Sequence, residues 1–287
     1  MKLQVKNLDF SYGLKKVLNI SEEEFETGNI YGIVGKNGAG KTTFFKALTN
    51  IIVNYSGDVM IDGQALKQNP ALLSNVGIVL DDMELYKNQT GLFNLRFFGG
   101  LRGSFDEEKV LKLAEELMLL DSINDKVSSY SLGMNKKLIL LISIMNDAQI
   151  LIFDEPFRGL DSKSVEWFKT YFLKIKEEGK MILISSHIQE DIQALSDKVL
   201  VLENGEFGSK FDLNEEELNY VYKVEVNNPE EFMKLLAGKG IQPKVSGEMI
   251  EFTLNETRYK ELFKLAVASE IEFYQIKKEG QFAQALN

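Results

Sequence analysis

The sequence predicts an α/β protein with a largely parallel sheet, and three observations support this. Short runs rich in Val and Ile alternate along the chain with longer amphipathic stretches. Several of these runs are apolar throughout, as expected for parallel strands covered on both faces. A glycine-rich segment, GKNGAGKTT, follows one such run and precedes an amphipathic stretch. Strands that alternate with helices favour a parallel sheet flanked by helices.

The expected strands cover residues 30–35, 58–62, 75–80, 149–154, 180–185 and 198–203. Asn204-Gly205 follows the last of them and predicts a hairpin, because a type I′ turn needs positive φ at both central positions. Helices are expected from about Asp106 and from Asp161 to about residue 178, each with apolar residues on one stripe. Residues 82–140 lack clear strands, which predicts a helical insertion.

The pattern changes at about residue 215, so we expect one domain at 1–214 and a second at 215–287. A strand YKVEV precedes a helix that opens at Asn228-Pro229, since Pro is favoured at the first helical position. Two short strands, a helix capped by Asn255 and a last strand follow. This β-α-β-β-α-β order predicts a small α+β appendage of the ferredoxin-like kind.

Charge and composition narrow the possible partners. The chain has 287 residues with 33 Lys+Arg against 43 Asp+Glu, a formal charge of -10, and no cysteine. Because nucleic acid binds to a basic protein surface, the negative charge leads us to expect no nucleic-acid partner. The absence of cysteine excludes disulfides and thiolate metal sites. The N-terminus lacks the apolar core of a signal peptide. The longest apolar run, from Leu138, is far shorter than the ~20 residues that cross a bilayer, so work at a membrane would need a partner.

GKNGAGKTT satisfies G-x-x-x-x-G-K-[ST] through Gly35, Gly40, Lys41 and Thr42. The glycines let backbone N–H groups turn toward phosphate oxygens, and the helix N-terminus adds its positive dipole end. Lys41 can reach the β- and γ-phosphates, and the Thr42 hydroxyl can ligate Mg²⁺. The other residues expected to line the nucleotide are Asn37, Gly38, Ala39 and Thr43.

ILIFDEP places Asp154 and Glu155 just at the end of an apolar strand. A carboxylate there can hold Mg²⁺, and a second beside it can polarise a nucleophilic water. After a phosphate-binding loop in a parallel sheet, the pair indicates nucleotide hydrolysis.

The order GKNGAGKTT, YSLGMNKKL, ILIFDEP, GLDS, SSH resembles the ATP-binding subunit of an ABC transporter over about the first 210 residues. The resemblance implies a P-loop NTPase core of the RecA-like kind, with an antiparallel β subdomain and a helical subdomain at about 82–140. It further implies ATP and Mg²⁺, a second ATP-binding subunit (a homodimer is favoured) and a separate polytopic membrane subunit. The expected location is the cytoplasmic face of the cell membrane.

The resemblance also assigns roles to individual residues. Tyr12 sits where the family stacks an aromatic ring on adenine. Glu155 is then the general base, and His187, the one histidine of the chain, takes the place of the switch histidine; Lys41 is the third catalytic residue. Asp161 matches the aspartate of the loop that touches the other subunit, and it can equally be a helix N-cap.

Two stretches depart from the family pattern. YSLGM replaces the usual LSGGQ and keeps only Ser131 and Gly133, which the family uses to grip the nucleotide of the opposite subunit. Asp81 stands where the family has a glutamine that contacts Mg²⁺ and the attacking water, although a shift of one residue would choose Asp82. Asp81 is therefore expected at the metal together with Thr42 and Asp154.

The function that this implies is ATP hydrolysis that powers export. The YSLGM form resembles the branch that exports bacitracin, lantibiotics and other peptides, and the aromatic residues Phe93, Phe97 and Phe98 suggest a groove for the membrane subunit. A soluble ATP-binding regulator stays open as an alternative. A P-loop GTPase is disfavoured, because a guanine-selecting [NT]-K-x-D motif is absent.

Overall fold

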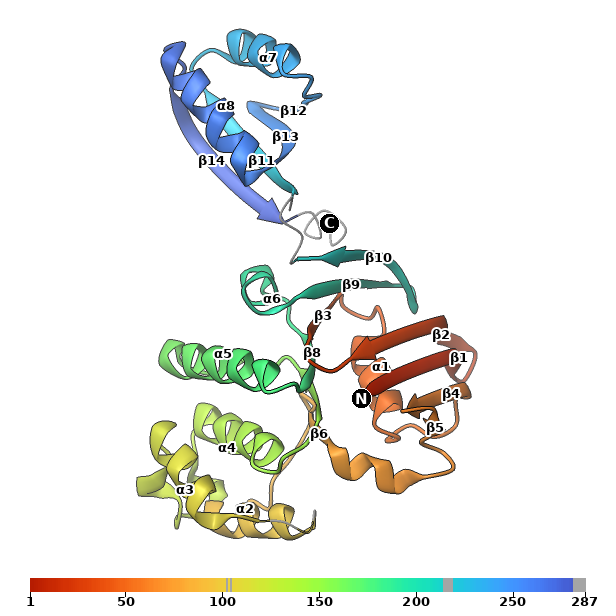
Figure 1. The fold of residues 1–287 in the computed structure, drawn as a ribbon. Coiled ribbons are helices and arrows are strands. Elements are labelled where there is room, and N and C mark those ends of the chain that lie inside the picture. Colours follow the sequence, from red (N-terminus) through yellow and green to blue (C-terminus); the bar gives the residue numbers. More distant parts are fainter. Residues whose placement is uncertain (102, 104, 214–218, 281–287) are drawn as a thin grey trace. The chain divides into compact units, whose positions relative to one another are not determined.

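The computed structural model describes residues 1–101, 103, 105–213 and 219–280 (Figure 1). The chain divides into two compact units, Met1–Lys210 and Phe211–Asn287.

The first unit is built on a six-stranded sheet in the order β10-β9-β3-β8-β7-β6. Its strands are β3 (Ile30–Val34), β6 (Val76–Val79), β7 (Ile150–Asp154), β8 (Met181–Ser185), β9 (Lys198–Glu203) and β10 (Glu206–Asp212). The strands from β9 to β6 pair in parallel, which confirms the predicted fold class. Asn204 and Gly205 have φ of 50° and 85° and lie between β9 and β10, as the hairpin prediction requires.

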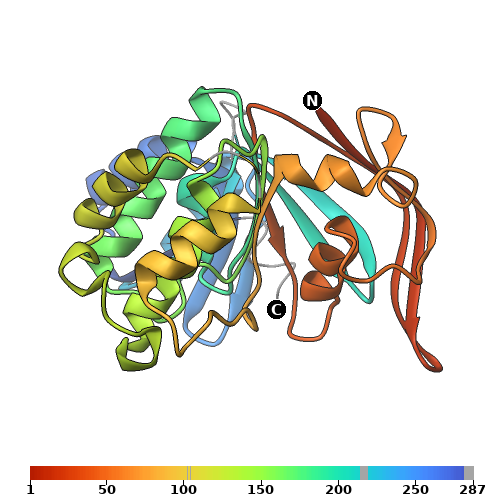
Figure 2. The same cartoon turned by 90° about the horizontal axis from the view of Figure 1, so that it is seen from below.

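A four-stranded antiparallel sheet forms the second layer, in the order β2-β1-β4-β5. It comprises β1 (Lys2–Tyr12), β2 (Lys15–Glu26), β4 (Ser56–Ile61) and β5 (Gln64–Ala65). The predicted strand at 58–62 thus belongs to this sheet. Helix α1 (Lys41–Leu48) packs between the two sheets, with Phe44, Phe45 and Leu48 in a core shared by both. Figure 2 shows the red and orange strands of this layer on one side of the unit and the green and yellow helices on the other.

Helices α4 (Leu132–Ile144), α5 (Ser162–Glu177) and α6 (Gln189–Leu195) cover the opposite face of the parallel sheet. Helices α2 (Gly91–Gly100) and α3 (Glu107–Glu116) pack against α4. Short 3-10 helices occur at Pro70–Asn75, Leu120–Ser122 and Val127–Ser129. Asp106 and Asp161 cap α3 and α5 through their carboxylates, which confirms the predicted helix start near Asp106 and the N-cap at Asp161. Between residues 82 and 140 the described part of the chain contains helices and an isolated β-bridge of Thr90 with Lys126, but no strand.

The second unit is a four-stranded antiparallel sheet in the order β12-β13-β11-β14, with two helices. Along the chain it runs β11 (Asn219–Val226), α7 (Pro229–Gly238), β12 (Lys244–Ser246), β13 (Met249–Asn255), α8 (Glu256–Ala268) and β14 (Phe273–Gly280). Asn228 caps α7 and Asn255 caps α8. Tyr222, Phe232 and Phe252 lie in a core of the unit's own residues. In the described ranges of both units, no helix combines the length and apolar character needed to span a membrane.

Candidate nucleotide-binding site

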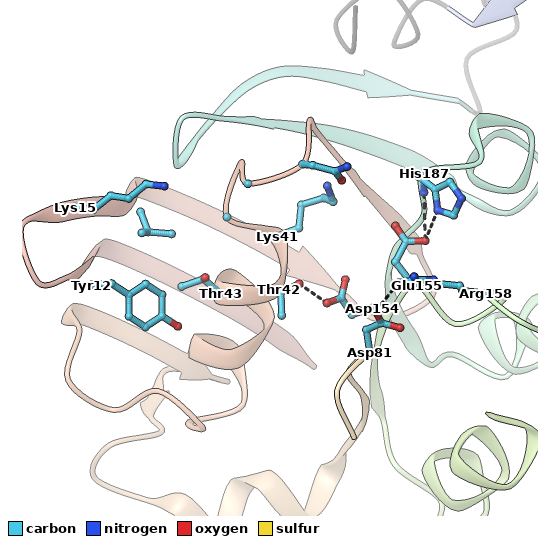
Figure 3. Close-up of a pocket in the computed structure, with 14 residues that line it drawn as sticks. Tyr12, Lys15, Lys41, Thr42, Thr43, Asp81, Asp154, Glu155, Arg158 and His187 are labelled. Carbon is cyan, nitrogen blue, oxygen red and sulfur yellow. Dashed lines mark hydrogen bonds and ion pairs between the residues drawn. The ribbon is translucent and has the colours of Figure 1, made fainter. Parts of the chain in front are cut away.

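The candidate site lies at the carboxyl ends of the parallel strands, where ligands of such sheets bind. The glycine-rich loop follows β3, Asp154 ends β7 beside Ser185 at the end of β8, and Asp81 comes shortly after β6. These ends open into a cavity of about 650 Å³ (Figure 3). Its lining residues are Tyr12, Lys15, Val17, Asn37, Gly38, Gly40, Lys41, Thr42, Thr43, Asp81, Asp154, Glu155, Arg158 and His187.

The glycine-rich loop needs its glycines for steric reasons. A Cβ on Gly35 would lie 2.3 Å from the carbonyl oxygen of Leu202, and Gly38 and Gly40 have left-handed φ of 83° and 110°. Lys41 Nζ donates to the Gly35 carbonyl oxygen at 2.7 Å, so the loop curls around the ammonium group. Burial lowers the pKa of Lys41, while the charges of Glu155 and Asp154 act in the opposite direction. Ala39 and Gly35 contribute backbone to this loop without lining the cavity.

Asp154 is the buried carboxylate of the site, with 2% of its surface exposed. It accepts hydrogen bonds from Thr42 Oγ1 and from Ser185 Oγ, each at 2.5 Å. A hydroxyl and a carboxylate oxygen therefore stand side by side at the start of α1. Hard oxygen donors of this kind are what Mg²⁺ prefers, so the donor set fits the expected metal.

Glu155 and His187 are in direct contact in the wall of the cavity. His187 Nδ1 lies 2.8 Å from Glu155 Oε2, and the His187 backbone N–H donates to the same oxygen at 3.4 Å (Figure 3). The His187 side chain is 63% exposed and that of Glu155 19%. Glu155 has a left-handed φ of 48°, and its N–H donates to the backbone oxygen and the Oγ of Ser185. The strand-end histidine thus points to the neighbouring carboxylate and not into the core.

Asp81 lines the cavity, but its carboxylate is engaged by cations. Arg158 Nη1 donates to Asp81 Oδ2 at 2.8 Å, and Lys136 Nζ lies 3.9 Å from Asp81 Oδ1. The neighbouring Asp82 pairs instead with Lys46 at 2.8 Å and does not line the cavity.

Besides Gly35 and Ala39, three predicted residues do not line this cavity, and they belong to other segments. Ser131 caps α4 by accepting from the Met134 N–H at 3.2 Å, and Gly133 comes close to the backbone oxygen of Gly159. Asp161 caps α5 through Ser164 and pairs with Lys137 at 3.0 Å. The Ser164 N–H and the Lys137 ammonium hold the pKa of Asp161 well below its usual range.

The cavity lining also includes Lys15, Val17 and Arg158, which were not predicted from the sequence. Lys15 is paired with Tyr12 across the β1–β2 hairpin, so the placement of Tyr12 could have pointed to it. Tyr12 is 55% exposed and meets Phe10 edge-on, with 4.8 Å between ring centroids. Arg158 lies on the turn between Glu155 and Asp161, where only its charge could have drawn attention.

An aromatic cluster on α2 lies apart from the cavity. Phe93, Phe97 and Phe98 contact the ring of Tyr86, with centroid distances from 5.0 Å to 6.2 Å. Three of these rings remain partly solvent-exposed, with Tyr86 at 49%, Phe93 at 39% and Phe97 at 37%.

Known proteins match this chain over both units. The ABC transporter family model matches residues 18–158. An uncharacterized ABC transporter ATP-binding protein of Bacillus subtilis (strain 168), YhcH, is 28% identical over 279 residues, which span 96% of this chain and 91% of the relative. The bacitracin transport ATP-binding protein BcrA of Enterococcus faecalis is 33% identical over 215 residues, 74% of this chain and 70% of BcrA. A solved structure, described as an ATP binding subunit of an ABC transporter, shares the fold with a TM-score of 0.69 at 23% identity, and covers 84% of this chain and 94% of its own.

Proposed function

The chain belongs to the ABC transporter ATP-binding proteins, and from this premise we propose that it hydrolyses ATP to power export through a separate membrane subunit. The cargo class that we propose is a peptide, antibiotic or other amphipathic compound. The name of BcrA, a bacitracin transport protein, supports this class.

The observation that carries the proposal is the arrangement of five side chains in one cavity. Asp154 accepts from Thr42, and Glu155 contacts His187, while Lys41 extends from the first position of α1. We assign phosphate binding to the loop N–H groups and Lys41, because a helix N-terminus and a lysine both favour anionic oxygens. Mg²⁺ held by Thr42 and Asp154 would neutralise phosphate charge.

In this assignment Glu155 is the general base, which accepts the proton of the attacking water. His187 holds the Glu155 carboxylate through the 2.8 Å contact and orients it toward the phosphate. Electrostatic stabilisation and positioning supply most of the acceleration in phosphoryl transfer. Tyr12 is assigned to the adenine ring, because it is the exposed aromatic side chain at the wall of the cavity.

Ser131, Gly133 and Asp161 are assigned to the nucleotide of a second, identical subunit. Their position outside the chain's own cavity supports a pair in which each signature segment serves the other subunit's site. The N-terminus of α4 suits this role, because Ser131 and Leu132 are exposed there and a helix N-terminus favours anions.

The aromatic cluster of α2 is assigned to the membrane subunit. Its partly exposed rings offer an apolar surface of the kind that binds a partner helix. Such a contact would hold the protein at the cytoplasmic face of the membrane. We further propose that residues from about 215 onward form an accessory domain that folds as its own unit, which its separate core supports.

The substitution Glu155→Gln tests the proposal. It removes the base while keeping side-chain size, so hydrolysis should fall below detection while ATP still binds and the subunit pair accumulates. Size-exclusion chromatography with and without ATP and Mg²⁺ would measure the pair, and phosphate release would measure turnover. Wild-type protein that binds no ATP, or a variant that hydrolyses at the wild-type rate, would contradict the assignment.

A further inference from the structure

Three charged side chains form a chain of contacts from the nucleotide cavity to helix α4. Arg158 Nη1 donates to Asp81 Oδ2 at 2.8 Å, and Lys136 Nζ lies 3.9 Å from Asp81 Oδ1. Arg158 and Asp81 line the nucleotide cavity and also a second cavity of about 280 Å³, whose wall includes Lys136 and Leu132. We call these three side chains the Asp81 triad.

Each member of the triad comes from a different part of the first unit. Asp81 follows β6, and Lys136 lies on α4, which begins just after Ser131. Arg158 belongs to the turn that starts at Glu155, and its N–H donates to the Glu155 backbone oxygen at 3.4 Å. The triad therefore connects the turn of the proposed base with the helix of the proposed signature segment.

Burial differs sharply among the three members. The Lys136 side chain is 9% exposed, whereas those of Asp81 and Arg158 are 43% and 65% exposed. In the described part of the chain, Asp81 is the only carboxylate within 4.0 Å of Lys136 Nζ. Burial lowers the pKa of Lys136, and the charge of Asp81 acts most strongly in the opposite direction. A buried cation is costly without a counter-charge, so Lys136 depends on Asp81, while the short 2.8 Å hydrogen bond to Asp81 comes from the exposed Arg158.

We infer that Arg158 and Lys136 are positioning residues that act through Asp81. Their contacts hold the Glu155 turn and helix α4 at fixed positions relative to each other for hydrolysis. The inference rests on the proposed ATPase function. A carboxylate that already neutralises two cations is a poor additional ligand for Mg²⁺, so Asp81 acts through its ion pairs and Thr42 and Asp154 serve the metal.

A double-mutant cycle on the full-length protein tests the inference. Arg158→Met should lower kcat for ATP by about tenfold or more and leave KM within about threefold, because a positioning group acts on the reacting geometry. Asp81→Asn should lower kcat similarly, and the double variant should lose no more than the worse single variant. The cycle of Asp81→Asn with Lys136→Met should give the same non-additive result.

Arg96→Met is the matched control. Arg96 is 56% exposed and pairs with Glu107 at 2.6 Å on the helical part of the unit, outside both cavities. The Arg96→Met variant loses an exposed arginine–carboxylate pair like that of Arg158, and the kcat of this variant should equal that of the wild type. Turnover of Arg158→Met within twofold of an active wild type would overturn the inference and leave the proposed function standing. Additive losses in the cycle, as expected for Asp81 acting on a metal, or a large rise of KM with unchanged kcat, would also overturn it. A wild type without ATPase activity would instead contradict the proposed function itself.

Discussion

Replacement of His187 by alanine tests whether this histidine is catalytic or is only a residue at a strand end. The imidazole contacts Glu155 Oε2 through Nδ1 at 2.8 Å, and 63% of the side chain is exposed. His187→Ala removes this contact and buries nothing new. Glu155 keeps the backbone hydrogen bonds from its N–H to Ser185, so its main chain should stay in place.

The expected effects on rate and on stability differ in size. Loss of one positioned group in a phosphoryl-transfer site costs ~10²-fold, which is about 2.7 kcal/mol of transition-state stabilisation at ~1.36 kcal/mol per tenfold. A partly exposed side-chain contact such as that of His187 with Glu155 contributes at most about 1 kcal/mol to the free energy of unfolding, the upper end of the range for exposed pairs. For a domain of roughly 150–250 residues, 1 kcal/mol corresponds to about 2–4 °C in Tm. Turnover should therefore fall about a hundredfold while Tm moves by less than about 4 °C.

Steady-state phosphate release and thermal unfolding of the same preparation measure both effects. Ile188→Ala is the control, because it truncates the adjacent residue, which is 42% exposed and does not line the cavity. Wild-type turnover in His187→Ala would refute the reasoning. A large drop in Tm would refute it in another way, since it would make His187 a structural residue.

Three further predictions concern the surroundings of the cavity. Ser131→Arg should leave nucleotide binding in a fluorescence titration nearly unchanged and abolish cooperative turnover; a weakened monomer affinity would speak against its action on a second subunit. Asp161→Asn keeps the helix cap but loses the charge that pairs with Lys137. Because the folded-state pKa of Asp161 is depressed, its stabilisation is complete above the unfolded value of about 3.9 and is lost as the pH falls toward the folded value. The stability gap between wild type and variant in urea unfolding should thus be constant from pH 7 to about pH 4 and shrink below, and a gap that widened in acid would contradict this. Gly35→Ala would place its Cβ 2.3 Å from the Leu202 carbonyl oxygen. The free energy of unfolding should therefore fall by about 1–3 kcal/mol, seen as a lower Tm, and ATP affinity should fall with it. An unchanged Tm would show that the loop shifts to accommodate the methyl group.

The hydrophobic pattern located the strands of the parallel sheet well but only one strand of the antiparallel layer, which the family resemblance had implied. The difference has a physical reason. The runs IYGIV and ILIFD are buried at every position, so hydrophobicity alone marks them. Strand β2 contains SEEEFE, whose acidic residues have low strand propensity. Lys2 of β1 lies 2.6 Å from Glu24 and 3.0 Å from Glu26 of β2, so cross-strand ion pairs compensate there. Such pairing depends on register, which a single sequence does not display.

In the candidate site too, residues within contiguous motifs could be predicted from the sequence, whereas contacts between distant segments could not. Lys41, Thr42 and Asp154 lie on contiguous motifs with a defined chemistry, and their meeting in one cavity follows from the topology of a parallel sheet. Ser185 and Arg158 carry no such signal, because a serine at a strand end and an arginine in a turn are common. Their contacts with Asp154 and Asp81 arise only when distant segments come together.

The left-handed backbone of Glu155 limits what evolution or an experimenter can place there. The residue at position 155 must meet two independent requirements: it must carry a carboxylate, and it must tolerate a φ of 48°. Valine, isoleucine and threonine do not meet the second requirement, because a β-branched side chain in this region is strained by about 1–3 kcal/mol. In a saturation library, aspartate, asparagine and glycine should therefore retain folded protein without full turnover, while β-branched replacements lose expression as well. A loss of activity at this position is evidence about the base only when the variant's abundance is measured alongside it.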